Sequence, residues 1–522
     1  MLSTTLPYPC LPTTLNQPSY HISNMGTGPH DGNAIFRYKG VWHAMHQANW
    51  TDWAHLVSTD LAHWSRISSA LSPNGDWDGS LTLLPDGQPV ILFDCYNVPD
   101  CNGSVLTRTS RRQAPRPSTQ RPEPNDHPLV GVARPSNISD PNLTKWHKDP
   151  RNPIRLFDVH GRPVTSGFAG PSNLFAAPDG LSFVMQLGRA IARLRLAEPT
   201  LHNWTVADAA FYPTGGHGGH GASGLSFYPL KPVERVEHDA AAAPPYDAFL
   251  GNLWVNGQSA GTQYVVLGRY VNGTFTPSAP AQRIDASDLV IFGSMQCSGG
   301  RCLHLGWFSP GCLTVPRELT YEHSLLTGPR MLSYPAKELH ALRVRRIGEH
   351  SAVPIKPGDH LAVFGVGEVS RIFDIDAQIA LPDVAHGGGM AIEVSILASN
   401  AAIADVVLTL EISDSVGSVS RVDASVGVPR APTASYNATM SFNSTLGGKS
   451  TLPLRILADK MIVEIFVDGG RAVLSAPVLA PTQPTERGNV YFRNRVATNK
   501  EDRAYAVSLQ AWAMGCGWAS YP

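Results

Sequence analysis

The sequence predicts an all-β protein with two domains in series, a β-propeller followed by a β-sandwich. The chain has 522 residues, which is more than one ordinary domain contains. Only 16% of the residues are charged, below the roughly 25% usual in soluble domains. Gly (47), Pro (43) and Trp (11) are abundant. This composition is typical of many short strands joined by tight turns.

Short strand-like runs joined by two-residue turns recur in the first part of the chain. Examples are NAIFRY-KG-VWHAMHQ, SLTLLP-DG-QPVILF, NLFAAP-DG-LSFVMQLG and YVVLGRYV-NG-TFTP. Asp-Gly and Asn-Gly accept positive φ at both turn positions, as a type I′ hairpin requires. The turn glycines are spaced by 47, 93 and 93 residues: Gly40, Gly87, Gly180 and Gly273. A repeated hairpin unit with insertions favours a propeller.

The pattern changes around residues 345–360. Beyond this point, segments such as MAIEVSIL, DVVLTLEI and KMIVEIFV alternate apolar residues with a period of two. Alternating strands with short polar turns predict a β-sandwich. We therefore expect a propeller over 18–345, a linker over 346–360 and a sandwich over 361–520.

Charge and hydropathy argue against two classes of partner. The net charge is −1, from 41 Lys and Arg against 42 Asp and Glu, whereas a nucleic-acid-binding domain carries a basic surface. No apolar run reaches the roughly 18 residues that a membrane helix needs. We expect neither nucleic acid nor a membrane as a partner.

Eight N-x-Ser/Thr sequons indicate a secreted or vacuolar glycoprotein, although the first residues show no signal peptide. The alternative is chance occurrence on a polar surface. The sequon residues are Asn49, Asn102, Asn137, Asn142, Asn203, Asn272, Asn437 and Asn443.

The seven cysteines fit an oxidising compartment. Cys95 with Cys101, and Cys297 with Cys302, are close enough in sequence to form loop disulfides. The sequence contains no C-x-x-C pair, so we expect no zinc site of the usual kind.

Several segments carry motifs in the same order as one enzyme family. They are YHISNMGTGPHDGNAIFRYKGVWHAMHQ, WTDWAHLVSTDLAHW, DWDGSLTLL, LHLGWFSPGCLTVPRELTY and LPLRILADKMIVEIFVDGGRAVLS. They resemble, in order, the W-M-N-D-P-N-G, W-G-H-x-x-S-x-D-L-x-x-W, F-S-G-S, P-R-E-L and L-R-I-x-x-D-x-x-x-V-E-x-F-x-x-G-G-R stretches of glycoside hydrolase family 32, the invertases, inulinases, levanases and fructan transferases. The resemblance runs from about Tyr20 to Trp512. It implies a five-bladed propeller, then a β-sandwich, with a funnel-shaped site at the propeller axis.

The resemblance also implies retaining cleavage of β-fructofuranosides. This reaction needs two carboxyl groups roughly 5–5.5 Å apart, of which one attacks the anomeric carbon and the other protonates the leaving oxygen. Asp31, in PHDGN, matches the nucleophile position. The alternative is a turn residue, because Asp-Gly pairs are common in turns. The chemistry uses carboxyl groups alone and implies no cofactor and no metal.

Five further positions are expected to line the sugar pocket. Gln47 matches the Gln after the first hairpin, Trp53 matches the aromatic of W-G-H, and Trp77 takes the place of the Phe of F-S-G-S. For both Trp residues the alternative is a core position. Asp78 replaces a Ser and either adds a carboxylate to the pocket or ends a hairpin. His30 replaces an Asn beside the nucleophile.

The two other acids of the family are missing. Ala169 and Gly170 stand where the family has the Arg and Asp of R-D-P, and Ser223 stands where it has the acid/base Glu. Loss of a general acid costs about 10²–10⁴ in rate. Asp78, or a carboxylate from residues 231–245, is a candidate replacement.

Three functions therefore remain open. The first is hydrolysis of sucrose, inulin or levan, or fructosyl transfer, with Asp31 as nucleophile. The second is a catalytically inactive fructan- or sucrose-binding homologue, because Gly170 and Ser223 replace the acids. The third is a shifted chemistry on another glycoside. The separation between Asp31 and a second carboxyl group discriminates among them.

Overall fold

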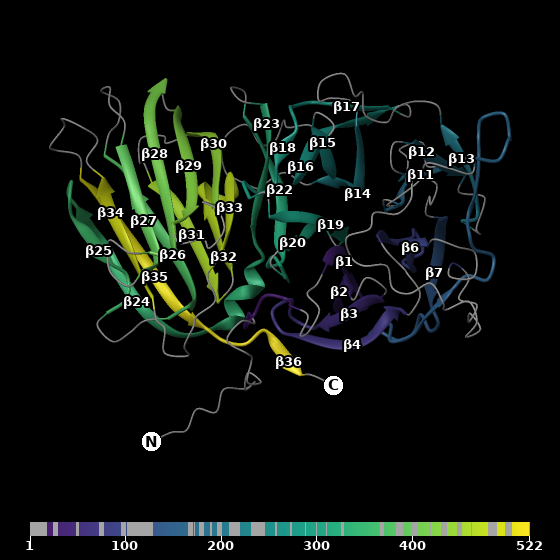
Figure 1. Cartoon of the computed structure of the whole chain (residues 1–522), viewed down its shortest axis with the longest axis horizontal. Coiled ribbons are helices and arrows are strands. Elements are labelled where there is room, and N and C mark those ends of the chain that lie inside the picture. Colours follow the sequence, from purple (N-terminus) through teal and green to yellow (C-terminus); the bar gives the residue numbers. More distant parts are fainter. Residues whose placement is uncertain are drawn as a thin grey trace.

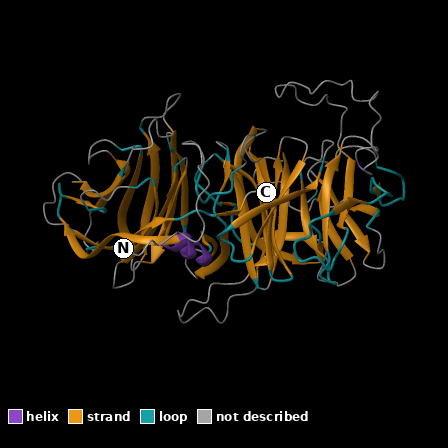
Figure 2. Ribbon diagram, turned by 90° about the horizontal axis from the view of Figure 1, so that it is seen from below, coloured by secondary structure: helices purple, strands orange, loops and turns teal. Residues whose placement is uncertain are grey.

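The computed structural model is built almost wholly from β-strands (Figures 1 and 2). It describes residues 18–520 apart from 24–29, 49–51, 73–77, 96–100, 102–128, 165–170, 177–181, 196–200, 208–219, 231–245, 383–389, 399–403, 430–435, 446–450, 479–487, 496–503 and gaps of up to four residues elsewhere. In parts of several strands only the backbone is described.

Five sheets follow one another between residues 30 and 335 and form the five blades of the predicted propeller. Blade 1 contains β1 (His30–Tyr38), β2 (Val41–Ala48), β3 (Asp52–Ser58) and β4 (Trp64–Leu71). Blade 2 contains β5 (Gly79–Leu83), β6 (Pro89–Cys95), β7 (Leu129–Pro135) and β8 (Trp146–Lys148). Blade 3 contains β10 (Phe175–Ala176), β11 (Ser182–Leu187), β12 (Ala190–Arg195) and β13 (Asn203–Ala207), with β9 (Arg155–Phe157) at its edge.

Blades 4 and 5 each add a short strand to a four-stranded sheet. Blade 4 contains β14 (His220–Leu230), β15 (Tyr246–Val255), β16 (Gln258–Val271) and β17 (Thr274–Pro277), and β18 (Gln282–Arg283) pairs with β16. Blade 5 contains β19 (Val290–Ser298), β20 (Arg301–Phe308), β22 (Arg317–Ser324) and β23 (Gly328–Pro335), and β21 (Cys312–Leu313) pairs with β20.

The hairpin turns show how local sequence sets these blades. Lys39 and Gly40 have φ of 45° and 89°, so the turn between β1 and β2 is of the predicted primed kind. In the turn between β5 and β6, Gly87 has φ of 80° and its N–H donates to the carbonyl oxygen of Leu84 at 2.7 Å. Gly180 and Gly273 lie outside the described residues.

Blade 1 closes the ring against blade 5. Ile35 of β1 packs with Leu303 and Leu305 of β20 in one buried cluster. Trp518 joins the same cluster from β36 (Trp518–Ser520), which pairs in parallel with β4. The end of the chain therefore returns from the second domain to the first blade (Figure 1).

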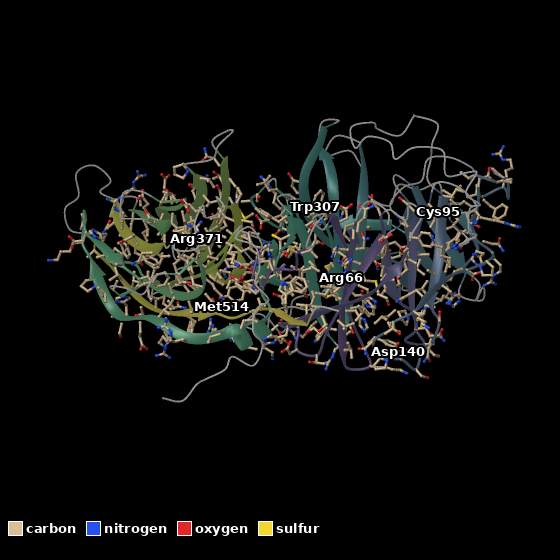
Figure 3. All side chains as sticks on the ribbon, turned by 60° about the horizontal axis from the view of Figure 1, so that its bottom comes forward. Arg66, Cys95, Asp140, Trp307, Arg371 and Met514 are labelled. Atoms are coloured by element: carbon tan, nitrogen blue, oxygen red, sulfur yellow. A yellow bond between two sulfur atoms is a disulfide. The ribbon has the colours of Figure 1, made fainter. Side chains whose placement is uncertain are left out.

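The second domain is a sandwich of two six-stranded sheets. One sheet has the order β24 (Arg343–Ile355), β35 (Tyr505–Met514), β26 (Ile372–Ala380), β31 (Thr451–Asp459), β32 (Ile462–Val467) and β33 (Ala472–Pro477). The other has the order β25 (His360–Ala362), β34 (Asn489–Arg495), β27 (Met390–Ala398), β28 (Val406–Val416), β29 (Val419–Val428) and β30 (Tyr436–Thr445). The apolar side chains of both sheets form one continuous core, and the stick view shows packed side chains filling both domains (Figure 3).

Residues 346–355 form part of a strand and not the predicted linker. They belong to β24, which pairs with β35 of the sandwich. The short 3-10 helix η4 (Lys337–Leu342) makes the connection between the domains. The strand escaped prediction because β24 is an edge strand with most of its side chains exposed, so it lacks a strict apolar alternation. A second 3-10 helix, η5 (Asp468–Gly470), follows β32.

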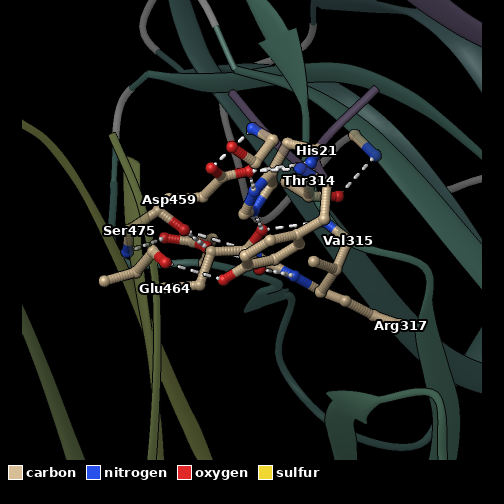
Figure 4. Close-up of polar contacts among 12 residues, drawn as sticks. His21, Thr314, Val315, Arg317, Asp459, Glu464 and Ser475 are labelled. Atoms are coloured by element: carbon tan, nitrogen blue, oxygen red, sulfur yellow. Dashed lines mark hydrogen bonds and ion pairs between the residues drawn. The ribbon is translucent and has the colours of Figure 1, made fainter. Parts of the chain in front are cut away.

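A buried polar network joins the two domains (Figure 4). The backbone N–H groups of residues 19–21 donate to the Asp459 carboxylate at 2.6–2.9 Å. The His21 ring contacts Asp459 through Nδ1 at 3.0 Å and Glu464 through Nε2 at 2.9 Å. Arg317 of blade 5 contacts Glu464 at 2.7 Å and Asp285 at 2.8 Å. All these side chains are buried, so the network ties the sandwich to blade 5 and to the segment before blade 1.

The charges of this network are matched internally. Burial by itself lowers the pKa of His21, but the hydrogen bonds and charges of Asp459 and Glu464 outweigh it and raise that pKa to about 9. Burial raises the pKa of Glu464, but Arg317 and His21 outweigh it and lower that pKa to about 2. His21 is therefore charged at neutral pH.

Candidate active site

Asp31 lies on an irregular part of β1, the first strand of blade 1. His30 pairs with Gln47, Gly32 with His46 and Ala34 with Met45, so the register shifts on both sides of Gly32. Such bulges leave a residue unpaired and redirect its side chain, and they are common beside active sites. Asp31 also has φ of 23°, an unusual value for a residue with a Cβ atom. Asp31 is thus a strand residue with a redirected side chain and not a turn residue.

Gly32 lets β1 approach blade 5 closely. A Cβ atom at this position would lie 2.5 Å from the carbonyl oxygen of Leu305 in β20. Backbone atoms cannot move aside as the end of a flexible side chain can, so only Gly fits. The Asp-Gly pair of the sequence therefore reflects a close approach between two blades.

Asp78 lies directly before β5 and contacts Asp31. Its carbonyl oxygen accepts a hydrogen bond of 2.8 Å from the Asp94 N–H, which fixes the backbone at the start of blade 2. A hydrogen bond joins the side chains of Asp31 and Asp78. The structure thus brings together two carboxyl groups that are 47 residues apart in sequence.

The pKa values of both carboxyl groups are raised, so the pair favours the retention of one proton. An ionised carboxylate only accepts hydrogen bonds, so a bond between two carboxyl groups requires one of them to be protonated. Burial raises the pKa of Asp31 well above its usual range, and the Asp78 charge and hydrogen bond raise it further. Burial also raises the pKa of Asp78, against an opposing hydrogen bond to Asp31. The pair therefore carries a single negative charge over a range of pH.

Other polar groups near these carboxyls are buried without a partner among the described residues. Gln47, opposite His30 across the β1–β2 pair, has no exposed surface, and neither atom of its amide is hydrogen-bonded. Nδ2 of Asn33, on β1, and Oγ of Ser80, on β5, are also buried and unpartnered. Buried polar groups normally have partners, so a ligand rich in hydroxyl groups would satisfy them.

Asn33 and Ser80 were not among the positions that the sequence motifs predicted. Their sequence signal was their place in HDGN and DWDGS, two residues after each carboxyl group. Side chains two residues apart on a regular strand share a face. This spacing could have predicted that Ser80 lies on the same face as Asp78. The bulges in β1 broke this rule for Asn33.

Trp53 lies in the core beside the site. It has no exposed surface and belongs to the buried cluster that also contains Phe36 and Phe93. Its Cζ2 atom would lie 3.0 Å from a Cβ atom built at Gly79, the residue after Asp78. Trp53 therefore supports the backbone that carries Asp78.

The remaining predicted positions are described only in part. Trp77, Ala169, Gly170 and residues 231–245 lie outside the described residues, and nothing is described of the His30 side chain. Ser223 lies on β14, where its backbone pairs with Asn252 and the register shifts on both sides of it. The first strand of blade 4 is thus irregular at Ser223, as β1 is around Gly32.

A hollow lies between blade 5 and the sandwich. Its volume is about 500 Å³, and Tyr334, Lys337 and His340 help to line it. Three of its charged side chains are held in ion pairs within the protein: Glu318 with Arg301, Asp376 with Arg343, and Arg455 with Asp374. Because these charges are compensated, the carboxyl pair is the stronger candidate for the reaction site.

The described residues contain neither a cluster of metal ligands nor a membrane-spanning helix. No group of three or more His, Cys, Asp or Glu side chains there could hold a metal ion. No helix within the described ranges is long and apolar enough to cross a membrane.

Family models match both domains. The model described as "Glycosyl hydrolases family 32 N-terminal domain" matches residues 21–121, which include Asp31 and Asp78. The model described as "Glycosyl hydrolases family 32 C terminal" matches residues 372–513. The chain belongs to glycoside hydrolase family 32.

Curated relatives of this family 32 chain include plant enzymes. The cell wall β-fructofuranosidase of Pisum sativum is 25% identical over 408 residues, which are 69% of this chain and 66% of that protein. The fructan 1-exohydrolase of Bromus pictus is 25% identical over 568 residues, 96% of this chain and 87% of that protein. The chain spans 62–66% of the length of the first curated relatives that it matches.

Solved structures show the same fold over the whole chain. Fructan 1-exohydrolase IIa from Cichorium intybus has a TM-score of 0.72 at 18% identity, over 98% of this chain and 99% of that one. The exo-inulinase of Aspergillus awamori has a TM-score of 0.67 at 15% identity, over 97% of this chain and 100% of that one. Both comparisons agree with a family 32 propeller followed by a sandwich.

Proposed function

We propose that this family 32 protein is a glycoside hydrolase of the β-fructofuranosidase type. It cleaves β-fructofuranosides such as sucrose, inulin or levan with retention, by hydrolysis or fructosyl transfer, and Asp31 is the nucleophile. The single observation that carries the proposal is the contact between the partly buried carboxyl groups of Asp31 and Asp78. Carboxyl groups with strongly raised pKa values are typical of functional sites.

Pocket chemistry and relatives support a fructoside as the substrate. The unpartnered amide of Gln47 and the unpartnered groups of Asn33 and Ser80 suit a hydroxyl-rich sugar. The Cichorium intybus enzyme has been solved with 1-kestose, and the Bombyx mori β-fructofuranosidase has been solved with sucrose. We place His30, Trp53 and Trp77 around the same pocket, Trp53 as the support beneath it.

The alternative is a sugar-binding homologue without turnover. Its basis is the replacement of two family acids by Gly170 and Ser223. The Asp31–Asp78 contact favours the enzyme, because a second carboxyl group stands next to the nucleophile. A binding protein has no need for a strained, desolvated carboxyl pair, which costs stability.

We propose an extracellular or vacuolar location for the protein. Five sequon asparagines lie in the described ranges, and all five are exposed: Asn137, Asn142, Asn203, Asn437 and Asn443. Disulfides join Cys95 to Cys101 and Cys297 to Cys302, as expected in an oxidising compartment. Curated relatives include cell wall enzymes.

The test is sugar release from sucrose, inulin and levan by the purified chain, with Asp31→Asn and Asp31→Ala as variants. We expect turnover of at least one substrate and its loss in both variants. Turnover unaffected by either substitution contradicts the role of Asp31. No turnover of any substrate, together with fructan binding in a calorimeter, supports the binding protein instead.

A further inference from the structure

We propose that Asp78 is the acid/base catalyst of this site and replaces the missing family Glu. The proposal rests on the proposed function and adds a second catalytic residue to it. In this proposal the proton of the Asp31–Asp78 pair is the one that general acid catalysis uses. That proton moves to the leaving oxygen during cleavage and is recovered from water afterwards.

The geometry supports this role. Asp31 is redirected by the bulges of β1, and Asp78 is held at the start of β5 by the hydrogen bond from the Asp94 N–H. β1 and β5 are the first strands of neighbouring blades and contact each other. Of the carboxyl groups that the structure describes, Asp78 is the one that contacts Asp31.

Ser223 cannot perform this task. A Ser hydroxyl is too weak an acid to protonate a leaving oxygen, whereas a buried carboxyl group keeps a proton near neutral pH. Without a sugar the proton of the pair favours Asp31, because the Asp78 hydrogen bond raises the Asp31 pKa while the Asp31 hydrogen bond lowers the Asp78 pKa. The proposal therefore requires the proton to pass to Asp78 when the sugar binds, which leaves Asp31 ionised and able to attack.

The reaction proceeds in two balanced steps. An oxygen of the Asp31 carboxylate bonds to the anomeric carbon while the bond from that carbon to the glycosidic oxygen breaks, and the Asp78 proton passes to that oxygen. A water molecule then attacks the anomeric carbon and gives a proton to the Asp78 carboxylate. The bond to Asp31 breaks, and both residues return to their starting state.

The contact between the two carboxyl groups is shorter than the reaction requires. Retaining enzymes hold their carboxyl groups roughly 5–5.5 Å apart, whereas hydrogen-bonded oxygens lie about 2.7 Å apart. The sugar must therefore separate the two side chains as it enters. The hydrogen bond from the Asp94 N–H holds the backbone of Asp78 and not its side chain.

The experiment compares two substrates in the full chain. Sucrose has a poor leaving group that needs a proton, whereas 4-nitrophenyl β-fructofuranoside releases a stable phenolate without one. Asp78→Asn and Asp78→Ser remove the acid, and the Ser variant carries the residue of the family's F-S-G-S motif. Asp86→Asn is the matched control, because Asp86 is exposed in the next turn of the same blade.

We expect both Asp78 variants to lose about 10²–10⁴ in kcat/KM on sucrose and to lose no more than about tenfold in the first release of nitrophenol. That release is expected as a burst followed by slow turnover, because the second step also lacks its base. Added azide, which needs no base, is expected to restore turnover.

Three results overturn the proposal. In the first, the Asp78 variants retain sucrose turnover within about threefold of the unsubstituted chain, which leaves the proposed function intact. In the second, folded variants lose both substrates equally, which assigns Asp78 to binding or structure. In the third, the unsubstituted chain cleaves neither substrate, which contradicts the proposed function itself.

Discussion

Replacing Glu464 by Gln is expected to destabilise the whole chain, because both domains depend on this carboxylate. It accepts four hydrogen bonds of 2.7–2.9 Å, from His21 Nε2, Val315 N, and Nε and Nη2 of Arg317. Gln keeps the shape but has one acceptor oxygen, and its NH₂ group faces donors. The substitution therefore leaves buried positive charge uncompensated.

Removing one partner of a buried ion pair costs about 3–5 kcal/mol. The four bonds are not additive, because they share one group. If the 522 residues unfold as one unit, the entropy of unfolding is about 1.1 kcal/mol/K near 60 °C. Glu464→Gln is then expected to lower Tm by about 3–5 °C, and by more if a single domain unfolds alone.

Thermal unfolding followed by Trp fluorescence measures this shift. Glu349→Gln is the matched control, because Glu349 is an exposed partner of Arg346, and surface pairs contribute little. We expect no measurable change in that variant. A Glu464→Gln chain that unfolds within 1 °C of the unsubstituted protein refutes the claim that the network holds the domains together.

Two further predictions concern stability. The pKa of His21 is raised from 6.5 to about 9, so its contribution is fully present below pH 6.5 and is lost as pH rises to 9. We therefore expect Tm to fall between pH 6.5 and 9, and we expect a smaller fall in the His21→Gln variant. Parallel curves of Tm against pH for the two proteins contradict this prediction. Gly32→Ala places a Cβ atom 2.5 Å from the Leu305 carbonyl oxygen, so we expect a loss of about 1–3 kcal/mol in denaturant unfolding. Gly365→Ala is its control, because a Cβ atom there meets nothing within 4 Å, and equal effects of the two substitutions show that close packing of β1 is not the cause.

The elements that local chemistry controls were predictable. The turn at Lys39 and Gly40 has the expected positive φ values, because few residues other than Gly adopt them. The sequence of β32 is apolar apart from one residue, and the strand is buried along its full length. The polar exception in that run, Glu464, is the residue that binds Arg317 across the domain boundary.

The edge strand β24 escaped prediction for a physical reason. A strand exposed on most of its length needs no apolar alternation, so its sequence resembles that of a linker. The pairing of Trp518 with Trp64 of blade 1 could not be predicted from the sequence either. Pairing between residues hundreds of positions apart leaves no periodic signal in either segment.

The sequence by itself determined the fold class, the family motifs and the position of Asp31, because these depend on residue type, period and order along the chain. It left Asp78 undecided between a pocket carboxylate and the end of a hairpin. Only the tertiary structure brings Asp78 next to Asp31, where the first strands of two neighbouring blades meet. A shared proton depends on distance and burial, and both arise when the blades pack around their common axis.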